Sequence, residues 1–251
     1  MPNNLATRIQ MILSDAFTFF VGNFRQIATM CLPFLLGIAL FQVILEQAYP
    51  ASPMAFLASV ALDAVIYPIY MGALIQLMAR RARQERPTSS ALITAAIPQY
   101  GRFLSLKIMV SFIIFVGFST LLVPGIWLRE SNAILGNFIL FIGMVVGIWI
   151  WGHLAFAEFY LVLFLTKPME SIDKSIKSTH KQISLIIALL LLTQVPILIL
   201  GVAMGSVFVT LMPNPIFQLA FTTGLATLEL FVHVVLFRAF MDVMAVQERP
   251  Q

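Results

Sequence analysis

The sequence predicts an all-α polytopic membrane protein with six transmembrane helices. Hydrophobic residues make up 60% of the 251 residues, whereas Asp, Glu, Lys and Arg make up 10%, against about 25% in a typical soluble domain. Six apolar runs each reach the roughly 20 residues that a helix needs to cross the hydrocarbon core. These runs are residues 27–46, 56–78, 103–127, 137–165, 183–211 and 216–241. We expect residues 1–251 to form a single integral membrane domain.

The loops between the runs predict the orientation of the chain. Basic residues gather in residues 79–86 ("ARRARQER") and 167–181, whereas residues 47–54 and 211–215 contain no Lys or Arg. Because cytoplasmic loops carry the excess of Lys and Arg, both termini are expected in the cytoplasm. The basic side chains either set the topology alone or also contact anionic headgroups or an acidic partner protein. The candidates for such contacts are Arg80, Arg81, Arg83, Arg86, Lys174, Lys177 and Lys181.

Three stretches on the basic side are amphipathic rather than uniformly apolar. Residues 5–24 carry apolar side chains at helical spacing, residues 88–97 begin with Thr88 as a candidate N-cap, and residues 169–183 carry a third apolar stripe. Helices with one apolar and one polar face lie flat at the level of the lipid headgroups. We therefore expect three cytoplasmic interfacial helices.

The third amphipathic stretch makes the most specific prediction. Ile172 and Ile176 fall on one face at a spacing of four, whereas Lys174 and Lys181 fall elsewhere. We expect the two isoleucines to face lipid or the protein core and the two lysines to face water.

Each amphipathic stretch is followed by a span, a short turn and a second span. The same layout therefore recurs over residues 4–80, 88–166 and 169–246. Because sequence identity between these units is poor, two interpretations stay open: three repeats of common ancestry, or the same layout reached without it.

Three segments of the chain resemble a known family. The segments are "GALIQLMARRARQERPTSSALITAAI", "LLVPGIW" and "SIDKSIKSTHKQISLI". Together they resemble the YciC family of bacterial inner-membrane proteins and, more distantly, the membrane domain that accompanies some glycerophosphodiester phosphodiesterases. The resemblance covers residues 17–244. It implies a bacterial inner-membrane location and loosely suggests work on the envelope or its lipids, and it implies no catalytic residues.

The chain departs from the family pattern after "VPGIW" (residues 123–127), where a further apolar stretch contains "FIGMVVGIWIWG". A Pro-Gly pair is a turn signal. Two arrangements stay open here: a full span after the pair, or an early turn followed by a partly re-entrant segment.

Ionisable side chains inside the spans are the candidate functional residues. Charged groups in hydrocarbon are costly and usually have partners or a function; here the candidate cluster is Asp63, His153, Glu158, Glu229 and His233. Glu229 and His233 are four residues apart and share a helix face. His153 lies at a similar depth to His233, so we expect the three to be neighbours in the bundle interior.

Three interpretations of the intramembrane cluster stay open: a hydrogen-bonded group that holds helices together, a proton relay or substrate contact, and a metal site. No tight ligand motif is present, so we expect no metal and no cofactor. At the end of the last span, Arg238 and Asp242 have the same spacing of four and are expected to form an ion pair near the headgroups.

Two Gly-x-x-x-Gly motifs occur at similar depth in the fourth and fifth spans. The first consists of Gly143 and Gly147, and the second of Gly201 and Gly205. Because small residues let helix backbones approach closely, the motifs predict that these two spans pack against each other.

Function is less constrained than fold. The sequence contains no Walker A loop, no His-Glu-x-x-His and no Gly-x-Ser-x-Gly motif. We therefore expect a non-enzymatic accessory or scaffold protein of the inner membrane that binds lipid or a larger membrane protein complex, and not nucleic acid, in envelope maintenance. The alternative is a small transporter or channel that uses the mid-membrane Glu and His side chains.

Overall fold

The structure, a computed structural model, describes residues 4–50, 52–211 and 214–247, with the side chains of residues 206–211 and 247 left out. Within these ranges helix is the only regular structure. The helices are α1 (Leu5–Gly22), α2 (Phe24–Ala48), α3 (Pro53–Ala82), α4 (Ser89–Ala96), η1 (Ile97–Gln99), α5 (Tyr100–Ser131), α6 (Ala133–Leu154), α7 (Ala157–Phe164), α8 (Pro168–Thr179), η2 (His180–Gln182), α9 (Ile183–Leu211) and α10 (Pro215–Gln247).

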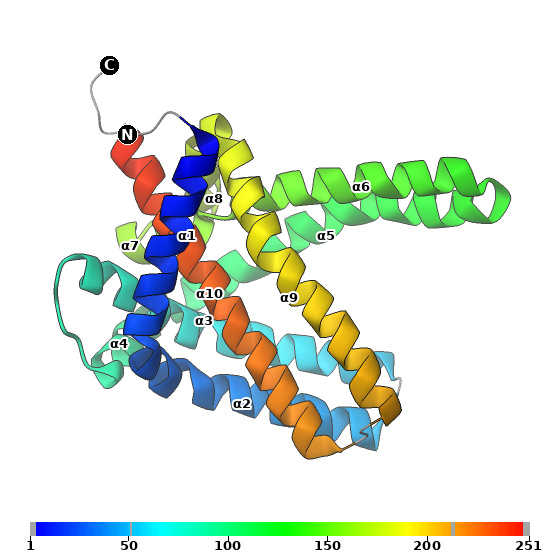
Figure 1. Ribbon diagram of the computed structural model, residues 1–251, viewed down its shortest axis with the longest axis horizontal. Coiled ribbons are helices and arrows are strands. Elements are labelled where there is room, and N and C mark those ends of the chain that lie inside the picture. The colour runs from blue at the N-terminus through cyan, green and yellow to red at the C-terminus, as the bar shows by residue number, and fades with distance from the viewer. Residues whose placement is uncertain (1–3, 51, 212–213, 248–251) are drawn as a thin grey trace.

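Six helical segments of the described chain are long and apolar enough to cross a membrane, which confirms the predicted all-α polytopic class. They form three antiparallel hairpins, α2–α3, α5–α6 and α9–α10, and a shorter helix precedes each hairpin (Figure 1). We call the end of the molecule with the hairpin turns the hairpin end. The opposite end, with α1, α4, α8 and most of the basic residues, is the basic end.

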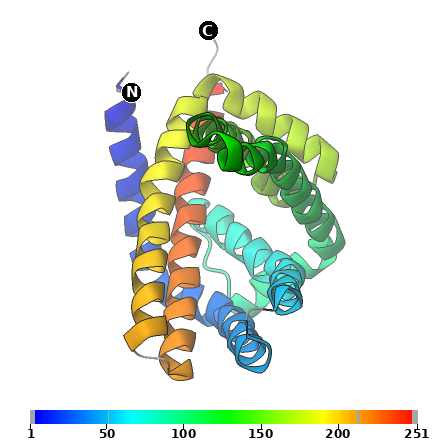
Figure 2. The same ribbon diagram turned by 90° about the vertical axis from the view of Figure 1, so that its right-hand side faces the viewer.

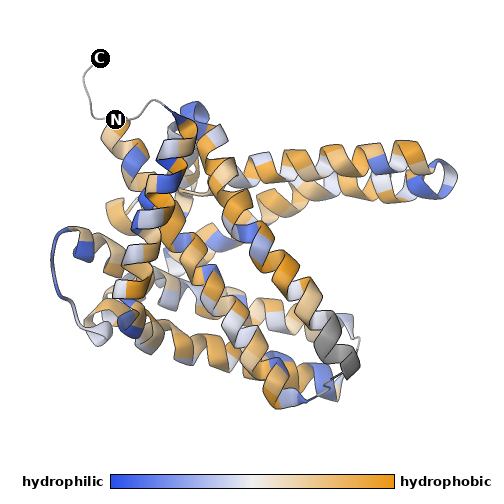
Figure 3. Cartoon of the chain, viewed as in Figure 1, coloured by the Kyte–Doolittle hydropathy of each residue, from blue (hydrophilic) through white to orange (hydrophobic). Residues whose placement is uncertain are grey.

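All three hairpins contribute side chains to one internal cavity. Helices α1, α9 and α10 lie side by side, α2–α3 lies below them, and α5–α6 forms a third side (Figure 2). The α5–α6 hairpin diverges from α9 and α10, so its tip lies well away from the other two tips (Figure 1). Apolar residues surround the shafts of the spans, and polar residues concentrate at the helix ends (Figure 3), as expected of helices in contact with lipid.

The best-packed part of the molecule lies toward the basic end. Side chains from α3, α5, α7 and α10 meet there and are at most 1% exposed. We call this group the apolar seal; it consists of Leu74, Phe103, Phe159, Phe237 and Phe240. The ring centroids of Phe159 and Phe237 are 5.6 Å apart in an edge-to-face arrangement, which is the geometry that aromatic pairs prefer.

The chain does not turn at the Pro-Gly pair of residues 124 and 125. Helix α5 continues through Pro124 and Gly125 to Ser131. The chain turns at Asn132, whose side chain accepts a hydrogen bond from the backbone N–H of Leu135 at 3.1 Å and so caps α6. The pair is therefore an interior feature of α5, and of the two arrangements left open, the early turn is wrong.

The glycine motifs do not join the fourth and fifth spans, so that prediction is wrong. A Cβ atom added at Gly147 would lie 2.2 Å from the ring of Phe118 in α5, and Gly143 likewise faces Leu121 of α5. Helix α6 therefore packs against α5. The short turn at Asn132 makes these two spans neighbours, and consecutive elements joined by short connections usually pack together.

The two residues of the second glycine motif, Gly201 and Gly205, do not contact α6. The side chain nearest to Gly201 belongs to Leu225 of α10, and no atom of the described residues lies within 4 Å of a Cβ built at Gly205. Helices α6 and α9 do meet, but nearer the basic end, where Gly152 faces Ile183 and Ile187.

The predicted ion pair between Arg238 and Asp242 is also wrong. A guanidinium nitrogen of Arg8 in α1 lies 2.5 Å from Oδ2 of Asp242, and another donates to Gln182 at 2.8 Å. Arg238 instead lies over the ring of Phe19 at 5.0 Å. The sequence spacing missed this because the true partner lies on α1, which is far away along the chain but packs along α10.

Helix α8 buries a hydroxyl-rich face. Ile172 is buried, but Ile176 remains 42% exposed, whereas Ser171, Ser175 and Thr179 are buried. Lys174 forms a 2.8 Å ion pair with Glu170 on the exposed side. The buried face of α8 is therefore set by hydrogen bonding as much as by apolar side chains.

Glycine substitutions test the packing of the α5–α6 hairpin. A Cβ at Gly136 would lie 2.5 Å from backbone atoms of Arg129, so Gly136→Ala should lower the free energy of unfolding by about 1–3 kcal/mol. Gly205→Ala, which meets no neighbour, should be neutral or stabilising by up to about 1 kcal/mol. Thermal unfolding in detergent checks both. Equal melting temperatures for the two variants would contradict this packing.

Candidate functional site

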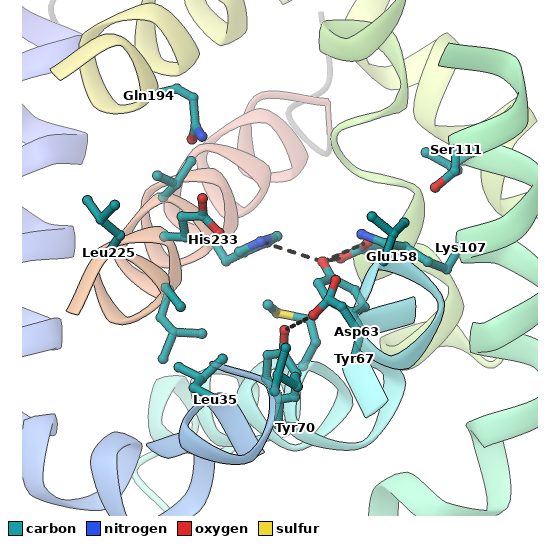
Figure 4. Close-up of a pocket in the computed structure, with 18 of the residues that line it drawn as sticks. Leu35, Asp63, Tyr67, Tyr70, Lys107, Ser111, Glu158, Gln194, Leu225 and His233 are labelled. Atoms are coloured by element: carbon teal, nitrogen blue, oxygen red, sulfur yellow. Dashed lines mark hydrogen bonds between the residues drawn. The ribbon is translucent and has the colours of Figure 1, made fainter. Parts of the chain in front are cut away.

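The intramembrane polar side chains line a cavity of about 580 Å³ between the three hairpins. We call it the chamber (Figure 4). Its walls come from α2, α3, α5, α6, α7, α9 and α10. Its polar lining consists of Gln42, Ser59, Asp63, Tyr67, Tyr70, Lys107, Ser111, Trp151, Glu158, Gln194, Thr222, Glu229 and His233.

The hydroxyl group of Tyr67 in α3 links its helix to α7 and α10 in the lining of the chamber. It donates to the carboxyl group of Glu158 in α7, with oxygen distances of 3.0 and 2.9 Å. It also lies 3.5 Å from Nε2 of His233 in α10. A tyrosine hydroxyl can donate one hydrogen bond and accept others, so these groups form a continuous chain of exchangeable protons from α10 through α3 to α7 (Figure 4).

A second group of charges lies beside this chain. The ammonium nitrogen of Lys107 in α5 lies 3.6 Å from the ring centroid of Tyr67, which is a cation–π distance. It also interacts electrostatically with Asp63, Glu158 and Glu229. Lys107 thus lines the same cavity as three carboxyl groups from three different helices, and the lining has a formal excess of carboxyl groups over ammonium groups.

Glu229 differs from the other acidic groups in the chamber. It lines the cavity, and its side chain is exposed. Tyr70 hydrogen-bonds to Asp63 at 3.5 Å, and Tyr67 bonds to Glu158, whereas Glu229 makes no hydrogen bond in the part of the chain that the structure describes. Glu229 is therefore a lining residue of the chamber whose carboxyl group has no hydrogen-bond partner among the described residues.

His153 lies outside the chamber, so the predicted proximity to Glu229 and His233 is wrong. Its Nδ1 hydrogen-bonds to the hydroxyl of Thr179 in α8 at 2.8 Å, and its ring packs edge-on against Trp149 at 4.4 Å. Depth along the span alone predicted this proximity, whereas the rotation of α6 about its axis turns His153 toward α8.

His153 belongs to a break in the predicted fourth span that positions Glu158. Helix α6 ends at Leu154, and α7 begins at Ala157. The hydroxyl of Ser175 in α8 bonds on both sides of the break: it donates to the carbonyl of His153 at 2.6 Å and accepts from the N–H of Phe156 at 3.1 Å. The new helix starts at this point, and Glu158 lies in its first turn, where a carboxyl group is favoured by the helix dipole.

The chamber adjoins a larger cavity at the hairpin end. This cavity has a volume of about 1170 Å³ and lies between the α2–α3 turn and the start of α10. The two cavities share lining residues from α2, α3 and α10, namely Gln42, Phe56, Ser59 and Thr222. The apolar seal lies on the basic-end side of Tyr67 and His233, because its residues follow Tyr67 along α3 and His233 along α10. The chamber is therefore approached from the hairpin end and closed toward the basic end.

Two central residues of the chamber did not stand out in the sequence. Tyr67 carries no charge and is an ordinary residue in an apolar span, and Lys107 was grouped with the basic residues of the loops. The available signal was spacing: Asp63, Tyr67 and Tyr70 fall on one face of α3 at intervals of four and three. Within the described residues, no three His, Cys, Asp or Glu side chains are arranged to hold a metal.

No family model, curated protein or solved structure with which the chain was compared matches it. The resemblance to the YciC family therefore stays a prediction, and the function must be inferred from the chamber itself.

Removing the Ser175 hydroxyl tests the break that positions Glu158. Ser175→Ala leaves the carbonyl of His153 and the N–H of Phe156 without this partner, so we expect a loss of about 1–3 kcal/mol in the free energy of unfolding. The matched control is Ser105→Ala, because the exposed Ser105 hydroxyl bonds only within its own helix. Detergent melting curves that fall equally for both variants would show that Ser175 has no special role.

Proposed function

We propose that the chain is a non-enzymatic membrane transporter that binds a small cationic solute, such as a primary amine, in the chamber. One observation carries this proposal: a cavity within the spans is lined by Glu229, whose carboxyl group makes no hydrogen bond with the described residues. A purely structural cluster would have its polar groups paired, because an unpaired carboxyl group in a low-dielectric region is costly. An amine from the solute would supply the missing partner.

The lining favours a positively charged ligand. Three carboxyl groups, those of Asp63, Glu158 and Glu229, face the cavity together with one ammonium group, that of Lys107. Tyr70 and Trp151 add aromatic faces, which attract cations. A ligand amine near Glu229 would compete with Lys107 for the same carboxyl groups.

The access route and the seal suggest an alternating mechanism. The chamber is approached from the hairpin end, and the apolar seal closes the basic end. Release toward the basic end requires the seal to open. A rigid movement of the diverging α5–α6 hairpin would open it, because α5 carries both Phe103 of the seal and Lys107 of the chamber. Rigid movement of one unit around a midplane site is a common mode of transport.

The Glu158–Tyr67–His233 chain offers a route for coupled protons. It connects Glu158 of α7 through Tyr67 of α3 to His233 of α10, the helix that also carries Glu229. A proton that moves along this chain would change the charge balance around Lys107 and so the affinity for a cation.

We place the protein in the bacterial inner membrane with both termini in the cytoplasm. The gathering of basic residues at one end of the molecule supports this orientation. The basic end would then be cytoplasmic, and the chamber would be approached from the outside.

A scaffold or accessory role in envelope maintenance remains the second candidate, and the α5–α6 hairpin favours it. Phe115, Trp127 and Ile134 are 68%, 81% and 86% exposed on this hairpin. Beyond its base the hairpin packs on no other helix of the described chain (Figure 1). Its surface would suit lipids or a larger membrane protein complex.

Ligand binding distinguishes the two candidates. A panel of small primary amines should raise the melting temperature of the purified wild-type protein, whereas carboxylic acids of matched size should not. Glu229→Gln should abolish the amine effect while the protein still unfolds at a similar temperature, because Glu229 has no described hydrogen bond to lose. The control is Glu130→Gln, an exposed carboxyl group at the tip of α5. Amine shifts that survive Glu229→Gln, or that never occur, would favour the scaffold.

The proposed orientation has a direct test. Cysteines placed at Arg83 and at Ser52 should be labelled by a membrane-impermeant thiol reagent from opposite sides, because the two positions lie at opposite ends of α3. Arg83→Cys should react only after the membrane is opened, and Ser52→Cys should react in intact cells. Labelling of both from the same side would rule out this topology.

A further inference from the structure

A second pocket lies at the basic end, apart from the chamber. It has a volume of about 420 Å³ and forms where the junction of α1 and α2 meets the end of α3 and the start of α4. We call it the arginine pocket. Three guanidinium groups and three hydroxyl groups contribute to its lining; they belong to Arg25, Arg81, Arg86, Thr29, Thr88 and Ser89.

Gln26 holds the walls of the arginine pocket together. A guanidinium nitrogen of Arg81 donates to Oε1 of Gln26 at 2.8 Å, and Nε2 of Gln26 donates to the carbonyl of Pro87 at 2.6 Å. The same glutamine therefore fixes the end of α3 and the loop before α4 against the start of α2. The pocket is a built feature of the fold, although Arg25 and Arg86 are exposed.

The charge of the arginine pocket is uncompensated. No Asp or Glu side chain contributes to its lining. The Nε–H group of Arg81 is buried and has no hydrogen-bond partner among the described residues. Arg25 and Arg86 likewise make no ion pair or hydrogen bond with the described part of the protein. Three guanidinium groups are thus gathered in a pocket whose described lining contains no carboxyl group.

The chemistry of the lining selects one class of ligand. Guanidinium groups match the oxygen atoms of phosphate in bidentate geometry. Ser89 is the first residue of α4, and Thr88 caps this helix by accepting from the N–H of Ala91 at 3.4 Å. The positive end of the α4 dipole therefore points to the same place, and the hydroxyl groups of Thr88 and Ser89 can donate to further phosphate oxygens.

We propose that the arginine pocket binds a phosphate-bearing anion. It would link α2, α3 and α4 and so fasten the first hairpin to the second at the basic end. The anion can reach the pocket as the headgroup of an anionic lipid or as a soluble phosphate. Both sources share the same recognition by Arg25, Arg81 and Arg86, and the proposal is independent of what the chamber binds.

Lipid retention tests the first source. The protein is placed in nanodiscs that contain equal amounts of phosphatidylglycerol and phosphatidylcholine, and the lipids that remain bound are identified by native mass spectrometry. Wild type should prefer phosphatidylglycerol, and Arg25→Gln/Arg86→Gln should lose about tenfold of this preference. The matched control, Arg83→Gln/Lys181→Gln, removes the same charge from exposed positions outside the pocket and should change it less than about twofold.

Soluble phosphate is tested in nanodiscs of phosphatidylcholine alone. Inorganic phosphate should raise the melting temperature of wild type above its value in chloride of equal ionic strength if the source is soluble, and the Arg25→Gln/Arg86→Gln variant should lose this shift. Arg81 is left intact in these variants because its bond to Gln26 supports the fold. If neither anion is preferred, or if the pocket variant and its control behave alike in both experiments, the proposal is overturned.

Discussion

The arrangement of the chamber depends on how two backbone groups are satisfied where the chain bends inside the protein. A spanning helix cannot break in hydrocarbon unless protein groups replace the lost backbone hydrogen bonds. Here the hydroxyl of Ser175 bonds both the carbonyl of His153 and the N–H of Phe156. Because these groups are paired, the chain can end α6, turn, and begin α7 in a new direction.

The consequences of the break reach both the chamber and the apolar seal. The first turn of α7 places Glu158 against Tyr67, and the following residues place Phe159 against Phe237. The break also explains why α8 buries Ser175 and Thr179, because both hydroxyl groups bond to residues at the break. A helix that would otherwise lie on the membrane surface by its apolar stripe is held to the protein by its hydroxyl groups.

The fold follows from the sequence wherever a single physical quantity determines it. Apolar length determines the spans, and the Lys and Arg distribution determines which ends lie together. The rotation of each helix about its axis is less accessible, because it depends on contacts between distant segments. His153 was therefore expected beside Glu229 and His233 although it bonds to Thr179, and Asp242 was given Arg238 as partner instead of Arg8.

The candidate site was partly predictable for the same reason. Asp63, Glu158, Glu229 and His233 stand out because ionisable groups within spans tend to face the interior, and all four line the chamber. Tyr67 and Lys107 did not stand out, although Tyr67 contacts Glu158, His233 and Lys107. A tyrosine in an apolar run carries no charge signal, so its role emerges only when three helices are brought together.

The central claim is that the chamber is open to solvent from the hairpin end. Thiol accessibility measures this directly, with Ser59→Cys and Ser111→Cys in the chamber and Phe112→Cys on the lipid-facing surface next to Ser111. A membrane-impermeant thiol reagent added from the outside should modify the first two and not the third, because a thiol in lipid neither ionises nor meets the reagent. Native Cys31 is buried and should stay unmodified. If Ser59→Cys and Ser111→Cys react no faster than Phe112→Cys, the chamber is closed to water and the account is wrong.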